Sequence, residues 1–463
     1  MNSSTRLSFR LPSSRTGTRG STLRCALGLL GLLVGCNRGD DSTLAPHSDS
    51  PGDSGGDPLI VSWGDLHAHS GLSHDGCEDP DALCLSDEDL PGQDFFENAG
   101  ANGLAFAALT DHAESVTYLR PDDGVELDIW DREKELVAAA EGGPVIPILG
   151  YEWTADAHRT VLVEDPAACA AYRIPGKPAV DLKAIFPGIE QYVANPDPGV
   201  LDSNTLAADL AEAGSADGCT PSRVISYLHH TAETTPGAVD WTSPAWPLDT
   251  DTVVEIASEH GSSECSLPAD EGCIWHLQQA VYYPEGATQI ALGLGRKLGF
   301  VGGTDRHDAD PGQLGMGPGF SAHFYDSDGD GVLDTPYGQY TTGTLTGVIT
   351  PSPLTRAAIF DAITARHTYA ASRVMNGLQV TAVGSDGSEF LPGDDIPAGT
   401  YTIHVELDDP DIGAWSAQLV APSDARLPVG DVTFAAGDVW YVRLDATVDG
   451  IEERAWASPF FGT

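Results

Sequence analysis

Histidine and carboxylate residues gather in five short stretches of this 463-residue sequence. Imidazole and carboxylate groups together suit zinc, iron and manganese, and a single ion needs only three or four protein ligands. The stretches hold nine candidate ligands, more than one ion can use, so we expect two or three divalent ions. Such a centre lowers the pKa of bound water from ~16 towards ~7 and polarises a phosphoryl or carbonyl oxygen, so a metal-bound hydroxide can attack without a serine or cysteine. The candidate metal ligands are His67, His69, Asp75, His112, Glu152, His158, His229, Asp305 and His307.

Each stretch follows a short apolar run that is typical of a buried β-strand. Segments with helical spacing, such as 87–101 and 131–140, lie between the runs. Strands that alternate with helices predict an α/β fold with a parallel sheet or barrel, whose active site lies where the carboxyl ends of the strands converge. We therefore expect the five stretches to meet in space. The runs are 58–63 before 64–76, 104–109 before 110–114, 145–149 before 150–159, 224–228 before 229–230, and 298–301 before 302–307.

Two of the stretches place candidate ligands two residues apart. Residues i and i+2 of a strand point to the same face, so His67 and His69 can present two ligands to one cavity, as can Asp305 and His307. Arg306 lies between the second pair, and the same alternation lets it point away from them.

The order of the motifs resembles the polymerase and histidinol phosphatase (PHP) superfamily, and within it an exported branch. This resemblance covers roughly residues 60–373 and implies a metal-dependent phosphoesterase with a distorted seven-stranded, TIM-like β/α barrel. The motifs that carry it are Gly-Asp-Leu-His at 64–67, Thr-Asp-His-Ala-Glu at 110–114, Gly-Tyr-Glu-Trp-Thr at 150–154, His-His at 229–230, Glu255-Ile256 with His260-Gly261, and Arg-His-Thr-Tyr-Ala at 366–370.

The resemblance also implies how the ligands are shared among the ions. Glu152 would bridge two ions, and either His74 or Asp75 could serve the third. The second ion's histidine could be His158 or lie elsewhere in the long segment before His229. The implied sets are His67, His69, Glu152 and Asp305 for the first ion, Glu152, His158 and His229 for the second, and Asp75, His112 and His307 for the third.

We also expect side chains in the motifs to act on the substrate. The predicted catalytic residues are Glu152, His230, which would hydrogen-bond the substrate, and Arg159. Either Arg159 or Arg306 would hold a phosphate oxygen, because guanidinium groups bind phosphate in two-pronged fashion. Asp111 is expected to orient a ligand, and the spacing leaves open whether His260 is a ligand or a structural residue.

The first 35 residues have the character of an export signal. Five arginines precede an apolar run that begins at Cys25 and is too short to span a bilayer. The run ends in Leu-Val-Gly-Cys, which resembles the lipobox of bacterial lipoproteins and implies lipidation of Cys36; the alternative is an ordinary signal with a chance cysteine. Residues 36–57 read as a flexible, acidic Ser/Gly-rich linker. We expect an exported protein anchored in the cell envelope by lipid alone, and the resemblance to lipoproteins, with Asn37 after the cysteine, implies the outer membrane.

Six further cysteines in an exported chain are expected to pair. Many pairings are possible, and the clustering favours Cys77 with Cys84, Cys265 with Cys273, and Cys169 with Cys219.

Two features lie outside the five stretches. Residues 326–334 place acids at alternating positions and a glycine sixth, which predicts a structural calcium loop; the alternative is an acidic solvated turn. From residue 374 to 463 short strand-like runs replace the earlier pattern and predict a C-terminal antiparallel β-sandwich after a catalytic domain at 58–373. The calcium ligands would be Asp326, Asp328, Asp330 and Asp334.

The charge composition limits the classes of partner and substrate that the protein can bind. The chain has 69 acidic and 23 basic residues and a net charge of −46, so nucleic-acid binding is excluded. The acidic surface would repel polyanions, and a small phosphoester therefore fits best as the substrate. Two alternatives are a metal-dependent amide or ester hydrolase on the same fold and a non-catalytic surface-binding lipoprotein. No pattern in the sequence specifies an oligomeric state.

Overall fold

The structure is a computed structural model. It describes residues 58–73, 92, 94–113, 115–119, 126–154, 157–165, 192–194, 206, 223–232, 239–243, 251–265, 283–313, 343–448 and 451–463. The predicted signal, Cys36, the linker, His74, Asp75, the calcium loop and the cysteines other than Cys265 lie outside these residues.

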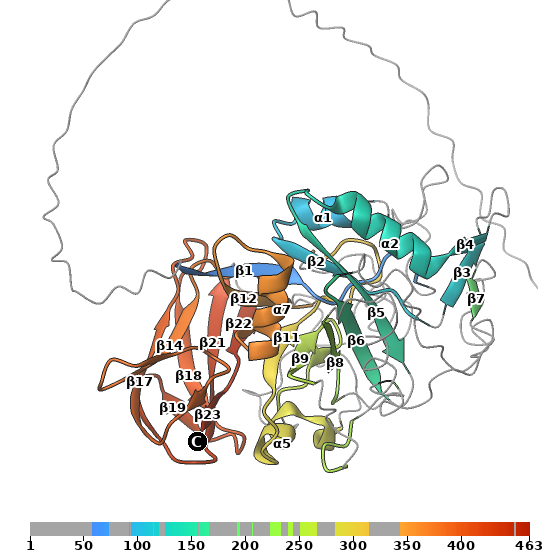
Figure 1. The fold of residues 1–463 in the computed structure, drawn as a ribbon. Helices are drawn as coiled ribbons and strands as arrows, with labels where there is room; N and C mark the ends of the chain where they lie inside the picture. The colour runs from blue at the N-terminus through green and yellow to red at the C-terminus, as the bar shows by residue number, and fades with distance from the viewer. Residues whose placement is uncertain are drawn as a thin grey trace, which may run out of the picture. The chain divides into compact units, whose positions relative to one another are not determined.

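The largest sheet of the described chain is a mixed sheet of 16 strands (Figure 1). Nine of its first ten strands run in the spatial order β10-β9-β8-β6-β5-β2-β1-β12-β13, and the tenth, β11, pairs with β9 off this path. These strands are β1 (Leu59–Asp65), β2 (Phe106–Leu109), β5 (Ile146–Thr154), β6 (His158–Val163), β8 (Val224–Leu228), β9 (Val253–Ser258), β10 (Gly261–Ser262), β11 (Gly299–Gly302), β12 (Leu345–Pro351) and β13 (Thr368–Ala371).

The expected seven-stranded β/α barrel is wrong, because strand directions are mixed and helices are few. β1, β2 and β5 are parallel neighbours, as are β8, β9 and β11, but β6 runs antiparallel to both β5 and β8. The link from β5 to β6 is too short for a helical crossover, so those strands must pair as a hairpin. The described residues contain four α-helices: α1 (Phe95–Ala101), α2 (Ile129–Ala140), α5 (Thr288–Gly293) and α7 (Arg356–Ala365), beside one 3₁₀ turn, η2 (Pro284–Gly286).

Six of the C-terminal strands continue the large sheet of the first part of the chain, so the expected division into a barrel and a separate β-sandwich is wrong. β22 pairs antiparallel with β13 and so joins the C-terminal strands to the first ten. The remaining strands of the large sheet are β16 (Asp395–Ile396), β18 (Trp415–Val420), β19 (Arg426–Pro428), β21 (Val439–Val448), β22 (Ile451–Ala457) and β23 (Phe460–Gly462).

Two smaller sheets accompany the large one. A four-stranded sheet has the order β15-β14-β17-β20, and a three-stranded sheet has the order β4-β3-β7. Their strands are β14 (Gln379–Gly384), β15 (Glu389–Phe390), β17 (Gly399–Glu406), β20 (Asp431–Phe434), β3 (Ser115–Leu119), β4 (Glu126–Asp128) and β7 (Tyr192–Ala194).

Apolar strands buried along their whole length hold the site in place. Every residue of β2, β9 and β11 is buried, as expected for strands covered on both faces. Helix α7 begins after Thr355, whose hydroxyl accepts a hydrogen bond from the Ala358 amide, and it packs Ile359, Phe360 and Ile363 into the core. The strand ends that carry the chemistry are therefore fixed on a rigid support.

Candidate metal centre

The segments that follow β1 and β11 lie side by side. The Asp305 amide donates to the His67 carbonyl at 2.7 Å, and the His69 amide donates to the Arg306 carbonyl at 2.8 Å. In the same way, the Glu152 amide donates to the Asp111 carbonyl at 3.0 Å. These backbone contacts bring stretches from four parts of the chain to one place.

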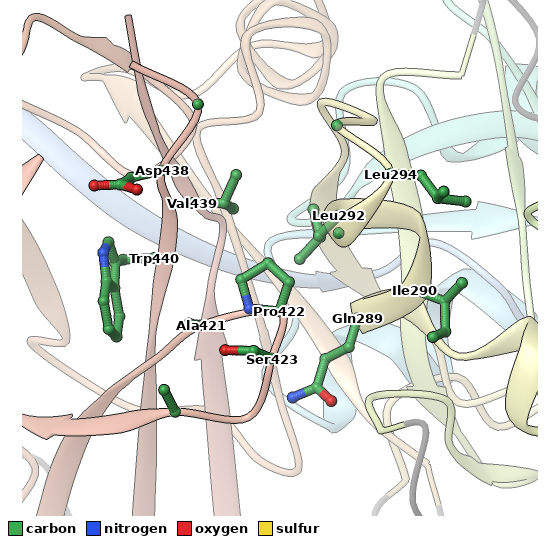
Figure 2. A pocket seen from close by; sticks show the side chains of 14 residues that line it. Gln289, Ile290, Leu292, Leu294, Ala421, Pro422, Ser423, Asp438, Val439 and Trp440 are labelled. Carbon is green, nitrogen blue, oxygen red and sulfur yellow. The ribbon is translucent and has the colours of Figure 1, made fainter. Parts of the chain in front are cut away.

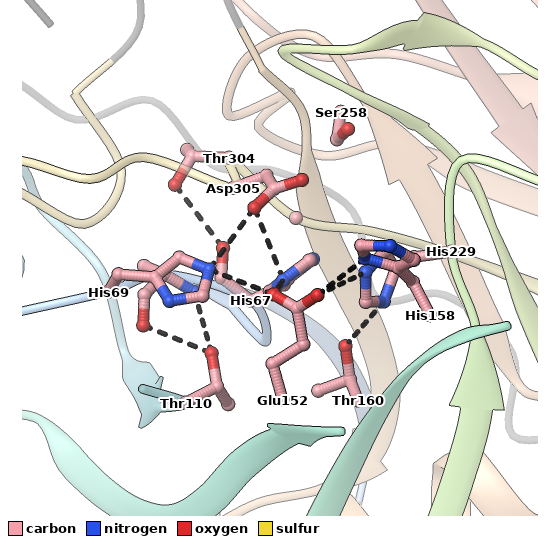
Figure 3. A network of polar contacts seen from close by, with 12 residues as sticks. His67, His69, Thr110, Glu152, His158, Thr160, His229, Ser258, Thr304 and Asp305 are labelled. Carbon is pink, nitrogen blue, oxygen red and sulfur yellow. Dashed lines mark hydrogen bonds and ion pairs between the residues drawn. The ribbon is translucent and has the colours of Figure 1, made fainter. Parts of the chain in front are cut away.

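The first group of candidate ligands is His67, His69, Glu152 and Asp305 (Figure 3). Oδ1 of Asp305 lies 3.2 Å from Nε2 of both His67 and His69. Oε2 of Glu152 lies 3.3 Å from Nε2 of His67 and 3.2 Å from Nε2 of His69. All four residues are buried, and residues more than 230 positions apart in the chain converge here, as the five stretches predicted.

The second group surrounds the other oxygen of Glu152. Oε1 lies 2.8 Å from Nδ1 of His158 and 3.2 Å from Nε2 of His229. His230 is also close enough to share an ion with these three residues. Glu152 therefore lies between two groups, the position that a bridging carboxylate needs.

The third group consists of His69, His112 and His307. The rings of His69 and His307 are stacked with centroids 4.2 Å apart, and Nε2 of His112 lies 3.5 Å from Oε2 of Glu152. His69 takes part here although the sequence placed it with the first ion alone, and the expected Asp75 lies outside the described residues.

The outward nitrogens of three histidines are held by neighbouring side chains. Nδ1 of His67 lies 3.0 Å from Oε2 of Glu255, Nδ1 of His229 lies 3.1 Å from Oγ1 of Thr160, and Nδ1 of His69 lies 3.3 Å from Oγ of Ser73. Such contacts set the tautomer and direct Nε2 inward, which is how metal-binding histidines are commonly held. The donor set therefore fits divalent ions: these buried histidine, glutamate and aspartate clusters could hold a metal ion.

Glu255 belongs to a motif of the family resemblance, but the sequence did not predict that Glu255, Thr160 or Ser73 would hold a ligand in place. A signal for Glu255 existed, because it is the one charged residue of the fully buried strand β9. Thr160 and Ser73 gave no signal, since hydroxyl residues are common and their partners are distant in the chain. Asp111 accepts hydrogen bonds from the Ser70 amide and hydroxyl at 2.6 and 2.7 Å, so it supports the segment between His69 and Ser73.

Charges in the cluster shift several pKa values. Burial alone would raise the pKa of Glu152, but His112 and His229 hold it well below its usual range. Burial opposes ionisation of Asp305 as well, yet His67 and His260 keep its pKa well below the ordinary value. Burial and then the charge of His67 lower the pKa of His229. Both carboxylates are thus ionised and able to act as ligands near neutral pH.

The two arginines of the motifs contact carboxylates elsewhere. The Arg159 guanidinium donates to Asp251 at 2.6 and 3.0 Å in a fully buried pair, and Arg306 donates to Asp308. The expected catalytic role of Arg159 therefore has no geometric support: alternation along β6 turns its side chain away from His158 and Thr160 on either side.

One pocket lies apart from the cluster (Figure 2). It has a volume of about 580 Å³ between α5 and the C-terminal strands, and Leu292, Pro422 and Trp440 are among its lining residues. Among the described residues that line it, Asp438 is the only charged one, so these residues offer no metal ligand set.

Cys265 is buried, and the pairing predicted for it involves Cys273, which lies outside the described residues. In the described part of the chain, no helix is both long and apolar enough to cross a membrane. The chain matches no family model, no curated protein and no solved structure.

Proposed function

We propose that this protein is a metal-dependent hydrolase that cleaves a small phosphoester. The observation that carries the proposal is the position of Glu152, whose two oxygens face two different groups of histidines. Carboxylates shared between ions are a feature of two-metal hydrolytic centres, in which the ions stabilise both the attacking and the leaving oxygen.

Two or three ions fit the ligand groups. The types of ligand atom indicate which metals these ions are. Imidazole nitrogens make up at least half of the ligand atoms in each group, which favours zinc, manganese or iron over magnesium or calcium. Ions of this kind acidify bound water and polarise a phosphoryl oxygen. A structural calcium ion at residues 326–334 remains a separate prediction from the sequence.

The chain's own residues position the reacting groups. Glu255, Thr160 and Ser73 hold the imidazoles of His67, His229 and His69, so the inward nitrogens need no reorganisation when an ion binds. His158 has an 18% exposed side chain, while those of His67 and His229 are completely buried. We infer that substrate approaches the centre from the side of His158 and His230, where His230 can hydrogen-bond it.

Charge favours a small substrate. The net charge of −46 repels polyanions, and the charge of one phosphoryl group can be balanced by the ions alone. Arg159 and Arg306 already contact Asp251 and Asp308, so they do not supply that balance.

The ion pairs that Arg159 and Arg306 form with aspartates favour a second candidate function, hydrolysis of an amide or ester. A carbonyl substrate needs polarisation by an ion but no phosphate-binding cation. We further propose that the protein is exported and anchored in the cell envelope through lipid on Cys36, as the lipobox-like sequence predicts.

A substrate panel tests these proposals. The full chain, loaded with Zn²⁺ or Mn²⁺, is assayed against aryl phosphomonoesters, phosphodiesters, esters and amides. We expect phosphoester turnover that is lost in His67→Ala and Asp305→Ala and kept in His404→Ala, a change at an exposed histidine. Turnover of ester or amide alone would favour the second candidate. No turnover at full metal occupancy would favour a non-catalytic binding protein.

A further inference from the structure

Asp305 faces two different sets of imidazoles with its two oxygens. Oδ1 lies 3.2 Å from His67 and His69 in the first ligand group. Oδ2 lies 3.3 Å from Nε2 of His260, a residue that belongs to none of the three groups already described. Asp305 thus occupies, at the opposite side of the first group, a position like that of Glu152.

His230, His260 and Asp305 form a fourth set of convergent ligand atoms. Each offers one atom, and these atoms lie within 4.8 Å of one another. The imidazole rings of His230 and His260 have centroids 4.7 Å apart and come from segments that follow β8 and β9. Two imidazoles and a carboxylate are a common three-residue ligand set for catalytic zinc and related ions.

We propose that His230, His260 and Asp305 bind a further divalent cation, and that Asp305 bridges this cation to the ion of the first group. The proposal rests on the metal centre of the proposed function, but not on which bond is hydrolysed. The second group does not require His230, because Glu152, His158 and His229 already provide three ligands, so His230 acts here as a ligand and not as a substrate contact.

The charge of the cluster supports a cation at this position. Glu152, Glu255, Glu259 and Asp305 are all buried. Buried carboxylates are costly unless opposite charge compensates them, and the arginines of the motifs are directed to other acids. A cation beside Oδ2 of Asp305 would supply part of that compensation.

The backbone at two of the ligands is also constrained. His230 has φ of 32° and Asp305 has φ of 57°, both in the left-handed region that residues with a Cβ rarely adopt. Such conformations are strained and tend to occur where a functional site needs a particular side-chain direction. Here they direct both side chains toward His260.

This site lies on the more accessible side of the cluster. The His260 side chain is 15% exposed, whereas those of His67 and His69 are completely buried. We therefore expect its cation to exchange faster than the ion of the first group and to be the first one that a substrate oxygen reaches.

Metal stoichiometry tests the proposal independently of turnover. The full chain and His260→Phe are dialysed to equilibrium against Mn²⁺ and their metal content is measured, with far-UV circular dichroism as a check on folding. We expect His260→Phe to bind one equivalent fewer than the wild type and His260→Asp, which restores a ligand, to recover it. His404→Phe serves as the matched control and should bind as many ions as the wild type.

Equal stoichiometry in folded wild-type and His260→Phe protein would overturn the proposal. If His260→Phe also bound inorganic phosphate more weakly at equal stoichiometry, His260 would be a substrate contact instead. Should His260→Phe fail to fold, His230→Gln provides the same comparison. A wild type that binds the extra equivalent but hydrolyses no substrate would leave this site intact and remove the proposed phosphoesterase.

Discussion

Glu255 and His67 form a completely buried pair, with Oε2 of the carboxyl group 3.0 Å from Nδ1 of the imidazole. Burial raises the pKa of Glu255 to about 7, while Asp305 and Glu255 together raise the pKa of His67 well above its ordinary value against the effect of burial. The pair holds His67 with Nε2 toward Glu152 and Asp305. Its geometry depends on Gly303, because a Cβ there would lie 2.4 Å from Cβ of His67 and 2.7 Å from Oε2 of Glu255.

Glu255→Gln should weaken metal binding without removing a ligand. The amide can still contact Nδ1 of His67, but it lacks the charge that makes the imidazole a stronger donor, so we expect an affinity loss of about 10–100-fold. Competition with a chelator for Zn²⁺ measures this. Glu406→Gln, at an exposed position of β17, is the control, and equal affinities in the two variants would show that Glu255 does not act through His67.

Gly303→Ala should displace the Glu255–His67 pair through a steric clash. The added methyl group overlaps both His67 and Glu255, so one of them must move. We expect lower metal affinity together with a loss of about 1–3 kcal/mol in the free energy of unfolding. Urea unfolding and metal titration measure the two effects. Gly413→Ala, where a Cβ meets no atom within 4 Å, should change neither; wild-type affinity in Gly303→Ala would contradict the packing described here.

Asp251→Ala should destabilise the protein strongly, because it leaves the Arg159 guanidinium buried without this carboxylate. Breaking a buried ion pair from one side costs about 3–5 kcal/mol. Denaturant unfolding of Asp251→Ala, Arg159→Met and the double variant measures the coupling between the two residues. We expect the double variant to be more stable than Asp251→Ala. Unchanged stability but lost turnover in Arg159→Met would restore the catalytic role that the sequence suggested.

Glu133→Gln should become more stable than the wild type as the pH rises, as measured by the free energy of unfolding. Glu133 is buried on α2, and burial followed by the charge of Asp111 raises its pKa well above the ordinary value for a glutamate. Its contribution to stability is therefore full below the unfolded-state pKa and is lost as the pH rises through the folded-state pKa. Between these two values the wild type should lose about 1.4 kcal/mol per pH unit relative to Glu133→Gln.

Urea unfolding of metal-free protein from pH 4 to pH 8 tests this prediction. Glu135→Gln, at an exposed position of the same helix, should show no such divergence from the wild type. Parallel stability curves for the wild type and Glu133→Gln would mean that the Glu133 carboxyl is not neutral in the folded state.

The local sequence was enough to identify most of the residues that converge. His67, His69, His229 and Asp305 each follow a short apolar strand and Glu152 lies near the end of β5, and burial of such a run is a property of a few consecutive residues. A polar side chain at the end of a buried strand has few directions available. We could therefore expect such side chains at neighbouring strand ends to lie close together. Their roles as metal ligands stay predictions until an ion is measured.

The tertiary structure alone decided three features. They are the direction of strand pairing, the contacts that hold the histidines in place, and the ion-pair partner of Arg159. β6 is antiparallel to its neighbours because the chain reverses direction directly after β5. An apolar run in the sequence does not indicate the direction in which its strand will pair. Arg159 pairs with Asp251, 92 residues away, and Glu255 meets His67 across 188 residues. Such partners become adjacent only when the whole sheet is assembled, since hydrogen bonds and ion pairs depend on distance in space and leave no periodic signal in the sequence.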